Sequence, residues 1–189
     1  MLNPILAIIA LNLLFFLATT ISQDLILDLG LWSPFEVFFH YPWGLITSMF
    51  LHDGFFHLLA NMITLYFFGT YLYRLLGSGK FLIIYFGGGI LGNIFFVLLG
   101  TLLDPYSLSL AIGASGAVFA LGGALAVIKP NIRVFIFPIP IPLPLWLAVI
   151  GGFLILSFLP YVAWQAHLGG LAFGLVAGYL FKKRTSYRF

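Results

Sequence analysis

Residues 81–102 read FLIIYFGGGILGNIFFVLLGTL, and no charged side chain interrupts the run between Lys80 and Asp104. An α-helix rises about 1.5 Å per residue, so about 20 apolar residues cross the hydrocarbon core of a bilayer. The run is long enough and apolar enough to predict a membrane-spanning helix. The other charge-free stretches of the chain are read by the same rule.

The composition of the 189-residue chain agrees with a membrane protein, since 62% of the residues are hydrophobic and only 7% are charged. A soluble domain carries about 25% charged residues, and a disordered chain needs low hydrophobicity, so both classes are excluded. The absence of cysteine excludes disulfides and thiolate metal sites. Eight basic residues in so apolar a chain do not make a nucleic-acid-binding face. We expect no nucleic-acid partner, no metal and no other cofactor.

The charge-free stretches predict six spans. The last of them, residues 134–181, contains 48 uncharged residues, which is enough for two helices with a turn at Pro160. The expected fold class is an all-α membrane protein, a six-transmembrane-helix bundle formed by a single domain over residues 1–189. We expect its helices near residues 3–22, 54–74, 81–102, 112–129, 143–159 and 162–181.

The segment between the first two spans, residues 23–53, is too long for a turn and too apolar for an ordinary outer loop. Its pieces at 36–43 and 45–51 resemble short segments lying in the membrane interface, with Trp32, Tyr41 and Trp43 at the level of the headgroups. Residues 138–144 alternate proline with apolar residues, which predicts an extended connection.

The signs of the charges predict the orientation. With the N-terminus in the cytoplasm, every Lys and Arg falls inside and every Asp and Glu falls outside, as the positive-inside rule favours. We therefore expect a multi-pass protein of the cell membrane with both termini cytoplasmic. Residues 1–11 lack the basic start of a signal peptide, so the first span is expected to be retained.

Few polar residues remain inside the spans, and such residues are functional hypotheses by default. His57 and Asn61, Ser115 and His167 stand at about the same shallow depth below the outer surface on three different helices. Asp53 precedes the second span, where we expect it to cap the helix.

Small residues at a spacing of four predict which helices pack together. Gly170, Gly174 and Gly178 form a ridge on the sixth helix, and Gly116, Ala120 and Ala124 form one on the fourth. Contact between the two ridges would bring Ser115 and His167 together at the outer end.

A serine beside a neutral imidazole is the minimum for nucleophilic acyl transfer, because the imidazole accepts the hydroxyl proton. His57, Asn61 and the backbone around Ser115 are candidate donors to the oxyanion. No carboxylate lies at this depth, so the sequence predicts a dyad. The sequence also contains neither HExxH nor a carboxylate pair within the spans, which disfavours metallo- and aspartyl proteases.

Each of these residues also has a structural explanation. Serine and asparagine in membrane helices often hydrogen-bond within or between helices, and we prefer this explanation for Asn93. We expect the glycines at 87–89 and 92 to serve close packing, and His40 and His52 to lie unremarkably at the interface.

Three motifs resemble the rhomboid family of intramembrane serine proteases. They read HDGFFHLLANM at 52–62, GASGAVFA at 113–120 and AHLGG at 166–170. The resemblance implies that Ser115 is the nucleophile, that His167 is the general base and acid, and that His57, Asn61 and the Ser115 backbone form the oxyanion hole. It further implies that Gly113 belongs to the serine motif, that Phe119 packs on the catalytic histidine, and that the chain has the minimal six-helix form of prokaryotic members.

Two positions depart from that pattern. Trp43 is followed by Gly44 where the family often has arginine, and Ile112 stands where a small residue is common. Neither departure removes a catalytic group.

The expected function is therefore an intramembrane serine endopeptidase that cleaves transmembrane segments of membrane proteins near their outer end. Its expected partners are transmembrane substrates and the lipid bilayer. Two alternatives are a non-catalytic rhomboid-like binding or chaperone protein and a small transporter. The first would be favoured by lost catalytic residues, and the second by a polar path through the whole membrane.

Overall fold

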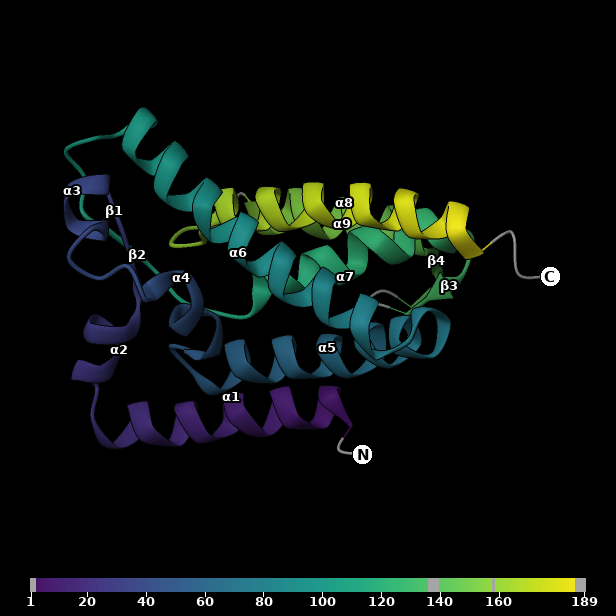
Figure 1. Cartoon of the computed structure of the whole chain (residues 1–189), viewed down its shortest axis with the longest axis horizontal. Helices are drawn as coiled ribbons and strands as arrows, with labels where there is room; N and C mark the ends of the chain where they lie inside the picture. The colour runs from purple at the N-terminus through teal and green to yellow at the C-terminus, as the bar shows by residue number, and fades with distance from the viewer. Residues whose placement is uncertain (1–2, 136–139, 158, 186–189) are drawn as a thin grey trace.

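A computed structural model describes residues 3–135, 140–157 and 159–185, and the side chains of 183–185 lie outside the description. Its long helices form a bundle in which α7 lies centrally, between α5 and the pair α8 and α9, while α6 crosses it obliquely (Figure 1). The predicted helical membrane bundle is confirmed. The long helices are α1 (Pro4–Ile21), α5 (Phe55–Leu76), α6 (Ser78–Leu103), α7 (Ser115–Ile128), α8 (Leu145–Ser157) and α9 (Trp164–Thr185).

The helices differ in length. Within the described residues, α1, α5 and α6 are long and apolar enough to cross a membrane, whereas α7 and α8 are shorter apolar helices of 14 and 13 residues. At about 1.5 Å per residue, α7 is about 21 Å long, less than the roughly 30 Å of a hydrocarbon core. At least one end of α7 is therefore expected to lie below the membrane surface.

Helix α7 begins at Ser115, three residues after the predicted start at 112. Gly113 has φ 126°, a backbone conformation that a right-handed helix does not contain. Ser115 is consequently the first residue of the helix.

The chain between α1 and α5 is an ordered first loop. It contains α2 (Asp24–Leu29), β1 (Leu31–Ser33), α3 (Phe35–Phe38), α4 (Gly44–Thr47) and the 3₁₀ helix η1 (Ser48–Phe50). The short pieces predicted at 36–43 and 45–51 correspond to α3, α4 and η1. The sequence did not predict that β1 pairs antiparallel with β2 (Ser109–Ala111), which ties the first loop to the segment that leads into α7.

Gly44 accounts for one departure from the family pattern. A Cβ atom at this position would collide with the backbone carbonyl oxygen of Gly30 and lie 3.0 Å from the Cα of Leu31. No side chain fits there without moving the loop, so arginine cannot follow Trp43 in this backbone arrangement.

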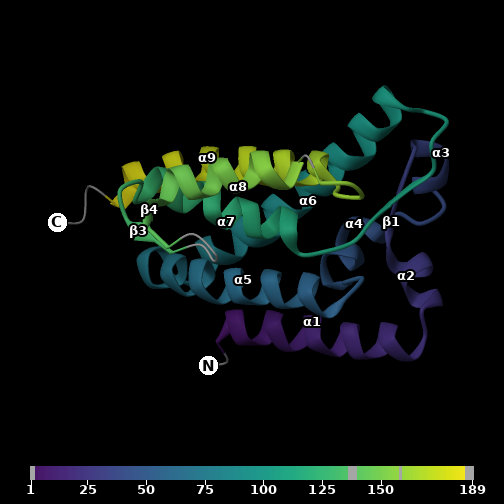
Figure 2. The same cartoon turned by 180° about the vertical axis from the view of Figure 1, so that it is seen from behind.

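The two ends of the bundle carry opposite charges. The start of α1, the end of α9 and the short antiparallel pair β3 (Arg133–Val134) and β4 (Leu143–Pro144) lie at one end, and α2, α3 and α4 lie at the other (Figures 1 and 2). Residues 138 and 139 of the predicted extended connection lie outside the described residues, as does Arg188. The acids Asp24, Asp28, Glu36, Asp53 and Asp104 belong to the first-loop end, and the bases Arg74, Lys80, Lys129 and Arg133 to the opposite end.

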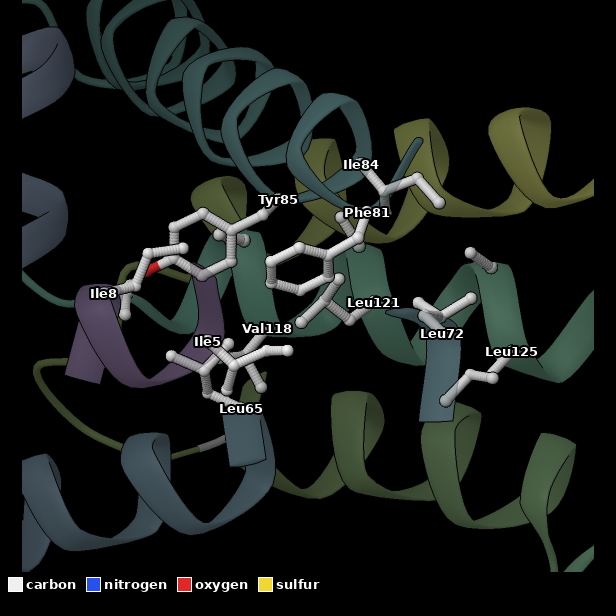
Figure 3. Close-up of a cluster of buried hydrophobic side chains, with 14 of the residues drawn as sticks. Ile5, Ile8, Leu65, Leu72, Phe81, Ile84, Tyr85, Val118, Leu121 and Leu125 are labelled. Atoms are coloured by element: carbon white, nitrogen blue, oxygen red, sulfur yellow. The ribbon is translucent and has the colours of Figure 1, made fainter. Parts of the chain in front are cut away.

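The labelled side chains of the buried apolar core come from α1, α5, α6 and α7 (Figure 3). Phe81, Ile84 and Tyr85 of α6 are completely buried between side chains of α1, α5 and α7. Many large apolar side chains instead point outward and are exposed, as expected where lipid surrounds the protein. Because lipid is as apolar as these side chains, close van der Waals packing must hold the helices together. The side chains labelled around Phe81, Ile84 and Tyr85 in Figure 3 are Ile5, Ile8, Leu65, Leu72, Val118, Leu121 and Leu125.

The predicted ridges of small residues do pack against each other. A Cβ atom at Gly170 would collide with the backbone of Gly116, one at Gly174 with the backbone of Ala120, and one at Gly178 would lie 2.7 Å from the carbonyl oxygen of Ala124. The glycines of α6 approach in the same way, since a Cβ at Gly92 would lie 2.5 Å from the carbonyl oxygen of Ala166. Helices α6, α7 and α9 therefore meet backbone to backbone.

Asn93 joins α6 to the first loop. Its Nδ2 donates to the Leu45 carbonyl oxygen at 2.9 Å and to Ser48 Oγ at 3.0 Å. The sequence predicted a bond between helices, and the partners lie in the short helices α4 and η1 of the first loop. The contact anchors the loop immediately before α5.

We predict that Gly174→Ala destabilises the bundle by about 1–3 kcal/mol, because its methyl group meets the Ala120 backbone. Gly151→Ala in α8 is the matched control, since nothing lies within 4 Å of a Cβ there and alanine favours a helix by about 1 kcal/mol over glycine. Unfolding of the detergent-solubilised variants measures both changes. Equal stability of the two variants would contradict the packing described.

Candidate active site

Ser115 and His167 meet at the first-loop end of the bundle. The serine is the first residue of α7, His167 lies in the first turn of α9, and the contact of Gly170 with Gly116 holds these two helix starts together. His167 Nε2 lies 2.7 Å from Ser115 Oγ. A neutral imidazole accepts the hydroxyl proton at this distance. The structure thus brings together the two residues that the sequence singled out for nucleophilic chemistry.

Packing holds the other side of the His167 ring. Its Nδ1 is buried and finds no hydrogen-bond partner among the described residues. The Phe119 ring packs against the His167 imidazole, with ring centroids 4.6 Å apart and ring planes inclined by 38°. His167 is only 6% exposed. An aromatic ring therefore packs on the imidazole of His167, and the dyad stays a prediction.

His57 faces the turn that precedes Ser115. A Cβ atom placed on Gly113 would lie 2.8 Å from His57 Nε2 and 3.7 Å from Ser115 Oγ. A hydrogen bond to the first loop holds this turn in place, because the Gly113 N–H donates to the Ser48 carbonyl oxygen at 2.9 Å. The first N–H groups of α7 have no partner within the helix. His57 Nε2 and these N–H groups border the same space beside the serine hydroxyl, which is where an oxyanion would form.

Asn61 lies one turn further along α5 and is buried. Its Nδ2 donates to the His57 carbonyl oxygen at 3.0 Å, which is a bond within its own helix. One of its two amide hydrogens is thereby engaged, and the second is left for another acceptor. The role of Asn61 in an oxyanion hole stays a prediction.

Asp53 does not cap α5 as predicted. The N-cap residue is Gly54, and it makes no side-chain capping bond. The Asp53 carboxylate instead lies 2.6 Å from His57 Nδ1 through its Oδ1 atom. Sequence reasoning missed this contact, although the i, i+4 spacing of an acid and a histidine was its signal.

His52, which the sequence places at the interface, is buried within the protein. It is 1% exposed, and its ring stands 4.9 Å from that of His57 at an interplanar angle of 67°. Burial, and to a lesser degree the neighbouring His57, lower the pKa of His52 to about 4. This loop histidine is therefore neutral near physiological pH.

Among the described residues, no group of three or more His, Cys, Asp or Glu side chains is placed to hold a metal ion. The chemistry that the site can perform with its own residues is attack by the serine hydroxyl on a carbonyl carbon.

Known proteins resemble this chain over much of its length. The Rhomboid domain family matches residues 40–184. Rhomboid protein 1, mitochondrial, of Saccharomyces cerevisiae is 31% identical over 154 residues, which cover 74% of this chain and 42% of that protein. Rhomboid protease GluP of Bacillus subtilis is 40% identical over 95 residues, 50% of this chain and 17% of its own length.

The relatives also include a protein named as inactive. Inactive RHOMBOID-like protein 8 of Arabidopsis thaliana is 33% identical over 133 residues, 69% of this chain and 36% of that protein. The chain spans less than half the length of the curated relatives it matches.

We predict that Gly113→Ala slows the labelling of Ser115 by a fluorophosphonate about tenfold or more, equivalent to about 1.4 kcal/mol or more. Alanine in a left-handed conformation costs about 1–2 kcal/mol, and its methyl group would push His57 away. Gly54→Ala is the control, because nothing lies within 4 Å of a Cβ there. An unchanged labelling rate in Gly113→Ala would contradict the placement of His57.

Proposed function

Since the chain belongs to the rhomboid family, we propose that it is an intramembrane serine endopeptidase that cleaves transmembrane segments of membrane proteins near their outer end. Residues 1–189 act as one rhomboid-like domain. The observation that carries the proposal is the 2.7 Å contact between Ser115 Oγ and His167 Nε2, two residues 52 positions apart in the sequence.

The first step forms an acyl-enzyme. Ser115 Oγ attacks the carbonyl carbon of the scissile peptide bond while its proton passes to His167 Nε2. The carbonyl oxygen becomes an oxyanion, which accepts hydrogen bonds from the Ser115 backbone N–H, from His57 Nε2 and from the Asn61 amide. The carbon–nitrogen bond then breaks, and the imidazolium of His167 gives its proton to the leaving amine.

The second step releases the acyl group. A water molecule attacks the ester carbon, and His167 accepts one of its protons. The ester C–O bond to Ser115 breaks and the serine regains its hydrogen from His167, which restores the starting state. Phe119 keeps the imidazole oriented in both steps, because its ring covers the face of His167.

The depth of the site suggests what a substrate must do. Ser115 stands at the end of a helix that is shorter than the membrane core, and a helical substrate hides its carbonyls in hydrogen bonds. A substrate segment must therefore unwind before cleavage, so helix-breaking or small residues near its outer boundary favour the reaction.

The proposed setting is a cell membrane in which both termini face the cytoplasm and the first-loop end faces outward. The separation of acids and bases between the two ends of the bundle supports this orientation. Water then reaches Ser115 from the outer side.

We predict that Ser115→Ala abolishes cleavage of a model single-span substrate reconstituted in liposomes, because no other nucleophile replaces the hydroxyl. Its unfolding in detergent should match that of the native protein. Fluorophosphonate labelling should be lost in parallel. Cleavage by the alanine variant at the native rate would overturn the assignment, and a native protein that binds substrates without cutting them would favour a non-catalytic rhomboid-like protein.

We predict further that the rate of cleavage falls on acidification, because His167 accepts the serine proton only when it is neutral. The single-turnover rate measured across the acidic range checks this expectation. His167→Ala should remove cleavage at every pH while leaving the fold intact. A rate that stays constant down to the pH at which the protein unfolds would contradict the role of His167 as base.

A further inference from the structure

We infer that Asp53 is a positioning residue that holds His57 as a doubly protonated imidazolium with its Nε2–H directed at the oxyanion. This inference rests on the proposed function, since it assigns the state of one of the proposed oxyanion donors. Asp53 contacts His57 and acts on the reacting atoms only through that side chain.

The hydrogen bond fixes where the protons of His57 lie. A carboxylate accepts hydrogen bonds, so the 2.6 Å contact with Asp53 Oδ1 requires a proton on Nδ1. A neutral imidazole carries only one N–H, and with that proton on Nδ1 its Nε2 would be an acceptor. Nε2 is the atom that faces Gly113 and Ser115. It can donate to an oxyanion in this geometry only when the ring carries both protons.

The position of His57 favours a carboxylate partner. His57 lies in the first turn of α5, where the partial positive charge of the helix N-terminus disfavours a cation. Asp53 stands just before the helix and forms no cap, so its negative charge is available to the ring. The Asp53 carboxylate thus offsets the partial positive charge of the α5 N-terminus beside the His57 ring.

The other titratable groups that face His57 do not compete for its charge. His52 meets the ring edge-to-face but is buried, and its lowered pKa of about 4 keeps it neutral. His167 lies across the serine and accepts its proton, so it too begins the reaction neutral. Of these three histidines, His57 is the one that contacts a carboxylate.

A charged donor suits this site. The developing oxyanion is negative, and hydrogen bonds from charged donors are about twice as strong as those from neutral ones. The side chains of Asp53 and His57 are 70% and 32% exposed, so solvent screens their interaction partly. We therefore expect Asp53 to modulate the donor rather than to decide whether the site works at all.

The test compares Asp53→Ala with the native protein in a liposome cleavage assay over the neutral and alkaline range. We expect kcat to fall by about tenfold, a fraction of the 10²–10³ typical for loss of a whole oxyanion donor, with KM changed less than twofold. The alkaline limb of the rate should move to lower pH, because the variant removes the carboxylate that contacts the charged ring. Asp53→Glu should retain most of the native rate and limb.

Two further comparisons separate positioning from a structural role. Asp53→Ala should have no additional effect on kcat in a His57→Ala background, since both changes remove one interaction. Asp104→Ala removes another acid of the first-loop end, and it should leave the rate and the alkaline limb unchanged. Nitrogen-15 spectra of histidine-labelled protein near neutral pH should report His57 protonated at both nitrogens in the native chain and at one in Asp53→Ala.

The two proposals fail in different ways. Absence of Ser115-dependent cleavage and labelling in the native protein overturns the proposed function, and this inference with it. Native cleavage accompanied by an unchanged kcat and alkaline limb in Asp53→Ala overturns the inference alone. A singly protonated His57 in the native spectrum overturns it as well, even where a variant proves inactive.

Discussion

The contact on which the molecule depends is the one between the backbones of α7 and α9. Gly170 lies directly on Gly116 and Gly174 on Ala120, so neither helix can move away or rotate without losing this packing. In lipid, apolar side chains gain little by leaving their surroundings, and association rests on such close contacts. The same contact sets the starts of both helices side by side. The 2.7 Å approach of His167 to Ser115 is therefore a consequence of helix packing several turns long.

Much of this arrangement could be predicted from the sequence, because its causes are local and periodic. Charge-free stretches define spans by length alone, and small residues four apart define a helix face. Gly170 and Gly116 could thus be matched before any coordinates were known, and with them Ser115 and His167. Phe119 followed from the resemblance to the rhomboid family, and the structure does place its ring on His167.

The features that escaped prediction depend on irregular backbone. The pairing of Leu31 with Ala111 joins segments far apart in the sequence, and three-residue strands carry no periodic signal. The late start of α7 at Ser115 follows from the positive φ of Gly113. Glycine permits this conformation, but its presence in the sequence does not predict it. Asp53 was misread because a carboxylate before a helix usually caps it. Only the orientation of its side chain distinguishes a cap from a partner of His57.

The polar groups of the site are graded by their exposure to water. His167 is 6% exposed and is held by an aromatic ring, whereas the His57 and Asp53 side chains are 32% and 70% exposed. A charge is costly at depth in a membrane and much cheaper near its surface. A base that must be neutral at the start therefore belongs in the packed interior, and a cationic donor with its carboxylate belongs at the rim. The opposite placement would bury an ion pair in the bundle and give the base no reason to remain uncharged.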